Sequence, residues 1–307
     1  MPRSTPRTKR AAAERLTGQP QTAHSTLVET DELAPHLGDP RLVIVDVRHD
    51  LADSAFGETA YAKSHLPGAV FAHIDRDLSA PRSPHSGRHP LPTPEAAARL
   101  FGRLGIDATK QVVAYDQGSG VYASRLWWML RWLGHESVAV LDGGFAKWMR
   151  EGRVTRTGVE KRAAAAFTPA VRSRMRLTVD EVGEHLGDGT MLLVDARSPE
   201  RFSGQPDPLD NVFGHIPGAR NRYYRDSISP EGTLRPVAEL RKEFAGVLGD
   251  RPPEDVVMYC GSGVTACHNL LAMEHAGLRG GRLFAGSWSE WEADPDRPVE
   301  KGPSKPR

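Results

Sequence analysis

A cysteine at the end of an apolar run is the strongest chemical signal in the sequence. Val256-Val-Met-Tyr259 leads to Cys260, and Gly261-Ser-Gly-Val-Thr265 then leads into a helical pattern. Two glycines so close to the cysteine let the backbone curl, so that successive N–H groups point at one place. The positive end of the following helix dipole lies at the same place. This arrangement favours an anionic sulfur, and we therefore interpret Cys260 as a nucleophile rather than as an inert buried cysteine.

Three nucleophilic chemistries are open to a cysteine in such a loop. A Cys-His protease needs a base and an oxyanion hole, and no local protease signature surrounds Cys260. A cysteine phosphatase needs an arginine six positions after the cysteine to bind phosphate, and that position is Ala266. Sulfur transfer needs only a thiolate held by backbone amides and a group that orients the donor. Sulfur transfer fits best.

The chain contains two copies of one pattern. The offset is 149 residues between Asp46 and Asp195, and it is 143 residues between Gly118 and Gly261. Because the offset drifts slowly along the chain, we interpret the pattern as a duplication with small insertions. The matched segments are Leu42–Arg48 with Leu192–Arg197, His65–Ala69 with His215–Ala219, Val112–Val121 with Val256–Val264, and Gly144–Trp148 with Ser287–Trp291.

Strand-like and helix-like stretches alternate in both halves, which predicts an α/β fold of two tandem domains. Each domain is expected to be a mainly parallel sheet flanked by helices, over residues 27–151 and 175–300, with a linker at 152–174. Parallel sheets place functional groups at the carboxyl ends of their strands, where Asp116 and Cys260 both fall. Strands are expected at 42–45, 112–115, 138–141, 191–194 and 256–259, and helices at 94–104, 123–133, 178–186, 236–248 and 264–276.

Composition excludes several classes of protein. The 307 residues carry 40 Lys and Arg against 39 Asp and Glu, and this balance argues against nucleic acid or an anionic membrane as a partner. No stretch approaches 18 consecutive apolar residues, which excludes a transmembrane helix. Residues 1–26 are rich in arginine and are expected to form a disordered leader, and 301–307 a polar tail. Since the leader lacks the apolar run of a secretory signal, the predicted compartment is the cytoplasm.

The two cysteines are too few for a disulfide framework or a four-cysteine zinc site. No metal-ligand spacing occurs, and Gly118-Ser-Gly120 lacks the third glycine of a dinucleotide-binding loop. We therefore expect neither a metal nor a cofactor. Cys267 follows Cys260 by two helical turns, about 10 Å along an ideal helix, so it is interpreted as a packed helical cysteine rather than a partner for a disulfide.

The active-loop sequence Cys260–Ala266, together with the duplicated framework, resembles the tandem-domain rhodaneses, the thiosulfate and 3-mercaptopyruvate sulfurtransferases. The resemblance covers residues 27–300. It implies that Cys260 carries a persulfide and that the first domain, with Asp116 in place of a cysteine, is not catalytic. It also implies a set of substrate-binding residues, which are Gly261, Ser262, Gly263, Val264 and Thr265 in the loop, Arg201 for the anionic group of the donor, and Asp75 and His89 from the first domain.

Neither donor pattern of the family is complete. Mercaptopyruvate enzymes commonly carry a second arginine where this chain has Leu209, and thiosulfate enzymes commonly carry two basic residues where it has Gly261 and Ser262. The expected donors are therefore 3-mercaptopyruvate or thiosulfate, and the expected acceptors are cyanide or thiols, thioredoxin among them. A monomer is expected. The alternative is a persulfide-relay or regulatory module that binds a protein partner and turns over small donors slowly.

Overall fold

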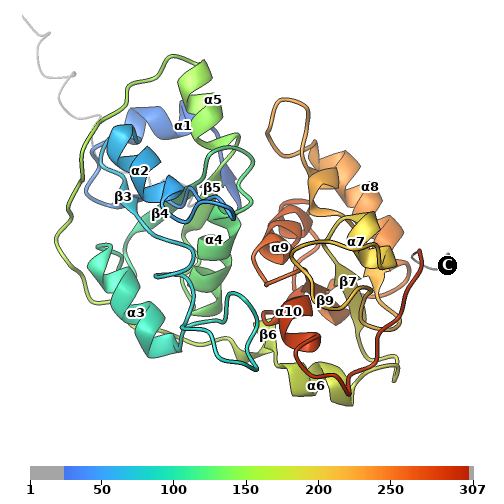
Figure 1. The fold of residues 1–307 in the computed structure, drawn as a ribbon. Coiled ribbons are helices and arrows are strands. Elements are labelled where there is room, and N and C mark those ends of the chain that lie inside the picture. The colour runs from blue at the N-terminus through green and yellow to red at the C-terminus, as the bar shows by residue number, and fades with distance from the viewer. Residues whose placement is uncertain (1–23, 304–307) are drawn as a thin grey trace, which may run out of the picture.

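The computed structural model describes residues 24–303, which form two α/β units side by side (Figure 1). Almost all of the leader predicted at 1–26, and more than half of the tail predicted at 301–307, lie outside the described residues. The first unit contains residues up to helix α5 (Gly144–Arg150), and the second begins at strand β6 (Arg176–Leu177).

Five parallel strands form the first sheet in the order β1-β5-β4-β2-β3. Its strands are β1 (Leu27–Val28), β2 (Leu42–Asp46), β3 (Val70–Phe71), β4 (Gln111–Tyr115) and β5 (Val138–Leu141). Both faces of β2 are buried: Val43 and Val45 pack into one core, Leu42 and Ile44 into another. Burial on both faces is why the strands are continuous apolar runs rather than alternating ones.

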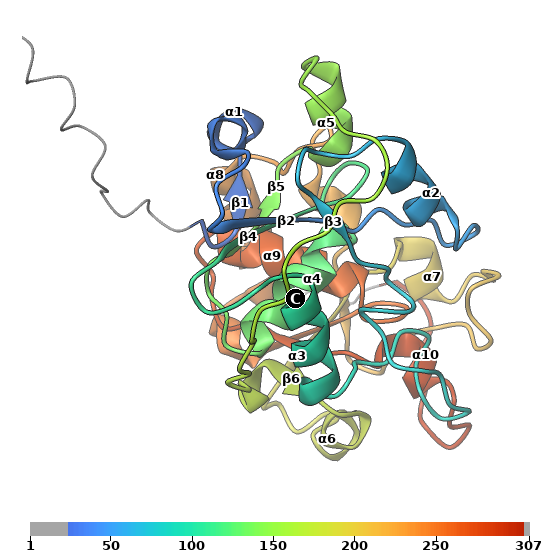
Figure 2. The same cartoon turned by 90° about the vertical axis from the view of Figure 1, so that its left-hand side faces the viewer.

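Helices cover both faces of this sheet, as Figure 2 shows. Helices α1, α2 and α5 pack on one face, while α3 and α4 pack on the other. Helix α3 begins where Thr93 accepts a hydrogen bond from the N–H of Ala96 (3.2 Å) and Pro94 occupies the first helical position. The other bounds are α1 (Thr30–Leu33), α2 (Phe56–Lys63), α3 (Pro94–Arg103) and α4 (Ala123–Trp132).

The second domain repeats the first, with five parallel strands in the order β6-β10-β9-β7-β8. The further strands are β7 (Leu192–Asp195), β8 (Arg220–Asn221), β9 (Val256–Tyr259) and β10 (Arg282–Phe284). The helices are α6 (Val179–Glu184), α7 (Pro199–Ser203), α8 (Val237–Leu248), α9 (Thr265–His275) and α10 (Ser287–Trp291). Single 3₁₀ turns occur at Ala34–His36, Ser173–Met175, Tyr224–Ser227 and Pro253–Asp255. The predicted fold class, two tandem α/β domains with parallel sheets, is confirmed.

The strand order places the same strand in the middle of each sheet. Strand β4 ends directly before Asp116, and β9 ends directly before Cys260. Each loop then leads into a helix, α4 or α9, that packs back against its own sheet. The two loops therefore occupy equivalent places at the carboxyl edges of the two sheets, where open parallel sheets bind their ligands.

Helices α4 and α9 pack against each other between the two sheets (Figure 1). All ten residues of α4 are buried, because one side lies on its sheet and the other on the second domain. Seven of the ten residues are apolar, and Ser124, Arg125 and Arg131 are buried with them. The tryptophan-rich run in α4 (Trp127, Trp128, Trp132) therefore forms core, and one continuous core joins the two domains.

The segment 152–174, predicted as a linker, lies along the first domain before it reaches β6 (Figure 1). The N–H of Ala165 donates to Gly102 O (2.9 Å), and the N–H of Ala170 donates to Leu133 O (2.8 Å). Phe167 packs edge-on against Phe101. The segment is thus attached to the first domain at several points along its length.

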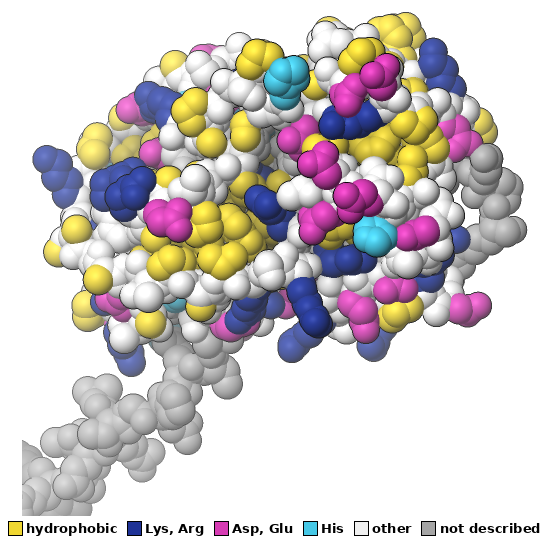
Figure 3. Space-filling view, turned by 90° about the horizontal axis from the view of Figure 1, so that it is seen from below, with side chains coloured by type: hydrophobic (Ala, Val, Ile, Leu, Met, Phe, Trp, Pro, Cys, Tyr) yellow, Lys and Arg dark blue, Asp and Glu magenta, His cyan; other side chains and the backbone are white. Residues whose placement is uncertain are grey.

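Across residues 24–303, no helix is both long and apolar enough to span a bilayer. Figure 3 shows one face of the molecule, on which basic and acidic side chains are interspersed across both halves.

We predict that His268 makes the domain interface sensitive to acid. His268 is fully buried in α9, its Nε2 donates to Ser119 O of the first domain (3.0 Å), and burial lowers its pKa to about 4. The unfolded chain therefore binds this proton at a higher pH than the folded chain does. The associated stability is present above about pH 6.5 and is lost as the pH falls towards 4.

Denaturant unfolding at pH 7 and pH 5 measures this effect. His268→Gln should reduce the loss of unfolding free energy between the two pH values by about 2 kcal/mol, relative to the parent. The exposed His85, replaced by Gln, is the matched control and should leave the loss unchanged. An identical pH dependence in the parent and in His268→Gln would contradict the assignment.

Candidate active site

Cys260 lies buried at the carboxyl end of β9, with its sulfur turned into the loop that follows. The N–H of Gly263 donates to Sγ of Cys260 (3.1 Å), and the side chain is 1% exposed. Ser287 connects the start of this loop to strand β10, because its hydroxyl accepts from the N–H of Cys260 (3.1 Å) and donates to Phe284 O (3.0 Å). Its backbone is left-handed (φ 57°), a strained conformation for a residue with a side chain.

The equivalent loop of the first domain holds an anion. The carboxylate of Asp116 accepts hydrogen bonds from four backbone N–H groups, at distances between 2.7 and 3.3 Å. The donors are Gly118, Gly120, Tyr122 and Ala123. In the repeat, Gly120 corresponds to Gly263, whose N–H contacts the sulfur of Cys260. The geometry of this loop therefore suits a buried negative charge in both domains.

A chain of three polar side chains crosses the domain interface beside the cysteine. Oγ of Ser262 lies 2.8 Å from Nδ1 of His89, and Nε2 of His89 lies 2.9 Å from Oδ1 of Asp75. Burial, followed by the charge of Arg125, lowers the pKa of His89 to about 4, so the ring is neutral at pH 7. Because a carboxylate can only accept, Nε2 donates to Asp75 and Nδ1 accepts from the Ser262 hydroxyl.

Arg201, at the start of α7, is held by a buried carboxylate. Its Nε donates to Oδ2 of Asp210 (2.8 Å), and its Nη2 donates to Oδ1 of the same residue. Asp210 also accepts from Nη1 of Arg197 (3.2 Å), and Asp207 lies 3.6 Å from Nε of Arg201. A two-pronged contact of this kind fixes the plane of the guanidinium, so Arg201 presents its remaining N–H groups in one direction.

Arg125 ties the two domains together at the loop. This residue of α4 is fully buried, and its Nη1 donates to Gly263 O (3.1 Å) in the second domain. Its Nη2 donates to His89 O (3.0 Å) and to Leu78 O (3.4 Å). Among residues 24–303, no carboxylate forms an ion pair with Arg125, although both cysteine sulfurs lie within its electrostatic reach. Burial lowers the pKa of Arg125, but an arginine side chain still remains charged.

A second guanidinium lies beside Arg201 over the loop. A Cβ atom built on Gly261 would lie 2.6 Å from Nη2 of Arg88 and 3.2 Å from Nη2 of Arg201. Two arginines, one from each domain, therefore converge on the residue next to Cys260. Leu209 stands where mercaptopyruvate enzymes commonly carry a second arginine, and the guanidinium of Arg88 lies beside it, with Nη1 donating to Leu209 O.

The structure brings all the predicted site residues to one place, though their roles remain a prediction. Gly261, Ser262, Gly263 and Thr265 line the loop and the start of α9, whereas the side chain of Val264 packs in the core. Arg201, Asp75 and His89 surround the loop, as the contacts above show. Sequence reasoning missed Arg88, Arg125 and Ser287. Arg88 directly precedes His89 in the sequence, and this adjacency to a predicted site residue was the one feature that could have identified Arg88.

Cys267 lacks the environment of a nucleophile. It is fully buried in α9, and its thiol donates to Gly263 O (3.3 Å). Burial raises its pKa to about 12, so it remains a neutral thiol at physiological pH. Its role as a packed helical cysteine agrees with these contacts.

One group of possible metal ligands occurs within residues 24–303, formed by His49, His73 and Asp75. Nε2 of His73 is hydrogen-bonded to Ser54 O (2.9 Å), and its Nδ1 accepts from the N–H of Asp75 (3.0 Å). Neither ring nitrogen is available as a ligand, and Asp75 is already paired with His89. These residues do not fit a metal ion.

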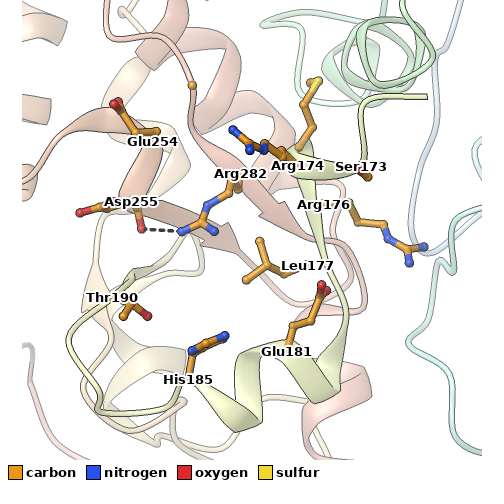
Figure 4. Close-up of a pocket in the computed structure, with 12 residues that line it drawn as sticks. Ser173, Arg174, Arg176, Leu177, Glu181, His185, Thr190, Glu254, Asp255 and Arg282 are labelled. Carbon is orange, nitrogen blue, oxygen red and sulfur yellow. Dashed lines mark hydrogen bonds between the residues drawn. The ribbon is translucent and has the colours of Figure 1, made fainter. Parts of the chain in front are cut away.

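A cavity of about 730 Å³ opens at the opposite edge of the second sheet (Figure 4). Glu254 and Asp255, which precede β9, line it together with Arg282 at the start of β10. Nη2 of Arg282 donates to Asp255 O (3.4 Å) across this cavity. Since Cys260 follows β9 at its other end, the cavity is separate from the cysteine loop, and no cysteine lines it.

Comparison with known proteins places this geometry in a family. The family model of the rhodanese-like domain matches residues 29–151 and 178–294. A Pseudomonas aeruginosa protein named "Probable 3-mercaptopyruvate sulfurtransferase" is 42% identical over 278 residues, which cover 90% of this chain and 98% of that protein. The mitochondrial thiosulfate/3-mercaptopyruvate sulfurtransferase 1 of Arabidopsis thaliana is 33% identical over 305 residues, covering 89% and 78% of the two chains.

The fold agrees with a solved structure as well. The crystal structure of SseA from Escherichia coli superimposes with a TM-score of 0.73 at 35% identity, covering 87% of this chain and all of that one. A duplicated parallel α/β domain with one cysteine loop thus defines the class. The chain belongs to the rhodanese family, in its tandem-domain form, and the predicted class of enzyme, a sulfurtransferase, is confirmed.

We predict that Arg125 controls the reactivity of Cys260. Arg125→Met removes a buried cation near the sulfur, so alkylation by iodoacetamide at pH 7 should slow by about tenfold, which corresponds to about 1.4 kcal/mol of lost interaction with the sulfur anion. The rate is measured in a Cys267→Ser background, with circular dichroism as the check on folding. Arg125→Lys keeps the charge and should retain more of the rate. A folded Arg125→Met protein with the parental rate would refute this role.

Proposed function

We propose that the protein transfers a sulfur atom from 3-mercaptopyruvate, through a persulfide on Cys260, to a thiol or to cyanide. The observation that carries the proposal is the repeated loop: four N–H groups surround the carboxylate of Asp116, and the N–H of Gly263, which corresponds to Gly120, donates to the sulfur of Cys260. A persulfide adds one further anionic sulfur at that place. The amides can therefore stabilise it without rearranging.

The loading step balances without a cofactor. The thiolate of Cys260 attacks the sulfur of the donor, the S–C bond breaks, and its electron pair goes to carbon as the enolate of pyruvate. The thiol proton of the donor ends on that carbon, so pyruvate leaves and the persulfide anion remains. An acceptor thiolate or cyanide then attacks the outer sulfur, and the Cys260 thiolate is restored.

The side chains from the first domain favour mercaptopyruvate over thiosulfate. The thiol of the donor must lose a proton that the enolate carbon later gains. The Ser262 hydroxyl can accept this proton while it passes its own to Nδ1 of neutral His89, and the same path run backwards delivers a proton to the enolate. Sulfite, the leaving group of thiosulfate, departs as an anion that needs no proton. The hydrogen-bonded side chains from Ser262 to Asp75 therefore contribute to loading from 3-mercaptopyruvate and not to loading from thiosulfate.

The names of two relatives support these donors. The Pseudomonas aeruginosa protein is named for 3-mercaptopyruvate, and the Arabidopsis thaliana protein is named for both thiosulfate and 3-mercaptopyruvate. Thiosulfate is therefore kept as the second donor. The acceptor, with thioredoxin among the candidates, the monomeric state and the cytoplasmic location all remain predictions.

We predict that Cys260→Ser abolishes sulfur loading. Intact-mass spectrometry after incubation with 3-mercaptopyruvate should show one added sulfur atom on the parent and none on the variant. Cys267→Ser is the matched control, because that thiol is buried and neutral, and it should load like the parent. Equal loss in both variants, or no added sulfur on the parent, would overturn the proposal.

A second prediction concerns Asp75. Asn at this position can donate to Nε2 of His89, which moves the ring proton to Nδ1 and leaves the Ser262 hydroxyl without its acceptor. Loading from 3-mercaptopyruvate should fall by about a hundredfold, while loading from thiosulfate should stay within about threefold of the parent. Rapid-quench mass spectrometry with each donor gives both rates. An equal fall with both donors would contradict a proton-relay role.

A further inference from the structure

We propose that Arg88 of the first domain and Arg201 of the second together bind the anionic group of the sulfur donor. The site is thus a pair of guanidiniums that spans the domain interface above Gly261. The inference rests on the proposed function, and it supplies the second cationic contact that Leu209 does not provide.

Both side chains present N–H groups at the same place. Nη2 of Arg88 and Nη1 of Arg201 would lie 2.6 and 3.7 Å from a Cβ on Gly261. Among the described residues neither nitrogen has a hydrogen-bond partner. Neither nitrogen is fully buried, since the fully buried polar atoms without a partner do not include them. These N–H groups are therefore accessible and free to bind a ligand next to Cys260. A carboxylate or a sulfonate offers the two or three oxygens that would satisfy both.

The rest of each guanidinium is used to hold it in place. Arg201 is fixed by Asp210, as described above. Arg88 is fixed by Leu209, whose carbonyl oxygen accepts from Nη1. The backbone N–H of Arg88 donates to Oγ of Ser289 (2.9 Å), and its carbonyl accepts from Nε of Arg82 (2.8 Å). The backbone N–H and the guanidinium of Arg88 are thus both hydrogen-bonded to the second domain, through Ser289 and Leu209. The guanidinium is therefore ordered before the donor binds.

Carboxylates also lie near the pair, but each is hydrogen-bonded to other groups; Asp207, for example, accepts from the N–H of Leu209 (2.9 Å). Asp210 lies between the two guanidiniums, 3.9 Å from Nη1 of Arg88, but its carboxylate is already bound by Arg201 and Arg197. The carboxylate of Glu292 accepts from the N–H groups of Asn211 and Val212. Burial, with the repulsion of Arg201 as a smaller cause, lowers the pKa of Arg88. An anionic donor would offset both effects.

Sulfur loading of the full chain, measured by rapid-quench mass spectrometry against donor concentration, tests the proposal. Arg88→Met should raise the half-saturating concentration by roughly ten- to a hundredfold, the loss expected for one charge-assisted contact, and should leave the limiting rate within about threefold. Arg88→Lys, which keeps the charge but not the fork, should fall between the parent and Arg88→Met. The matched control is Arg76→Met, an exposed arginine paired with Glu58 on the surface.

Each donor is tested separately. A rise with both 3-mercaptopyruvate and thiosulfate supports a general anion site, and a rise with 3-mercaptopyruvate alone supports a carboxylate site. If Arg88→Met loads with the parental half-saturating concentration, or loses only its limiting rate, the proposal is wrong while the proposed function stands. If the parent itself gains no sulfur, the proposed function fails. Should Arg88→Met not fold, Arg88→Gln is measured in its place with the same expected rise.

Discussion

The buried guanidinium of Arg125 is the interaction on which the arrangement of the site depends. It belongs to the first domain, yet it donates to the carbonyl of Gly263 in the cysteine loop and to the carbonyl of His89. One rigid, planar cation thereby fixes the distance between the two segments that carry Cys260 and the proton relay. Burying a cation without a carboxylate partner is costly unless an anion lies nearby. In the proposed reaction that anion is the sulfur of Cys260.

Duplication explains why one domain can support the chemistry of the other. Both domains retain the loop, the central strand and the helix that follows it. In the first domain the loop amides bind the carboxylate of Asp116, a side chain that has no sulfur to transfer. That domain instead contributes Arg88, His89 and Arg125, which contact the second domain, and Asp75, which holds His89. Because α4 packs against α9, these side chains of the first domain lie beside the cysteine loop of the second.

Much of the fold could be predicted from sequence because its signals are local. The apolar runs at 42–45 and 112–115 became β2 and β4. The two-residue strands β1, β3, β6 and β8 and the three-residue strand β10 were missed because they are too short to show a pattern. The repeat and the loop around Cys260 were likewise visible. Arg88 and Arg125 were not recognised as site residues, since their partners lie 121 and 138 positions away and no local pattern records such a contact.

A crystal structure of the Cys260 persulfide, formed with 3-mercaptopyruvate, tests the central claim most directly. The account predicts that the outer sulfur lies among the N–H groups of Gly261, Gly263 and Thr265, as the Asp116 carboxylate lies among those of Gly118, Gly120 and Tyr122. Arg125 should still donate to Gly263 O in that structure. An outer sulfur that contacts none of these amides, or a sulfur carried by a different residue, would contradict the account.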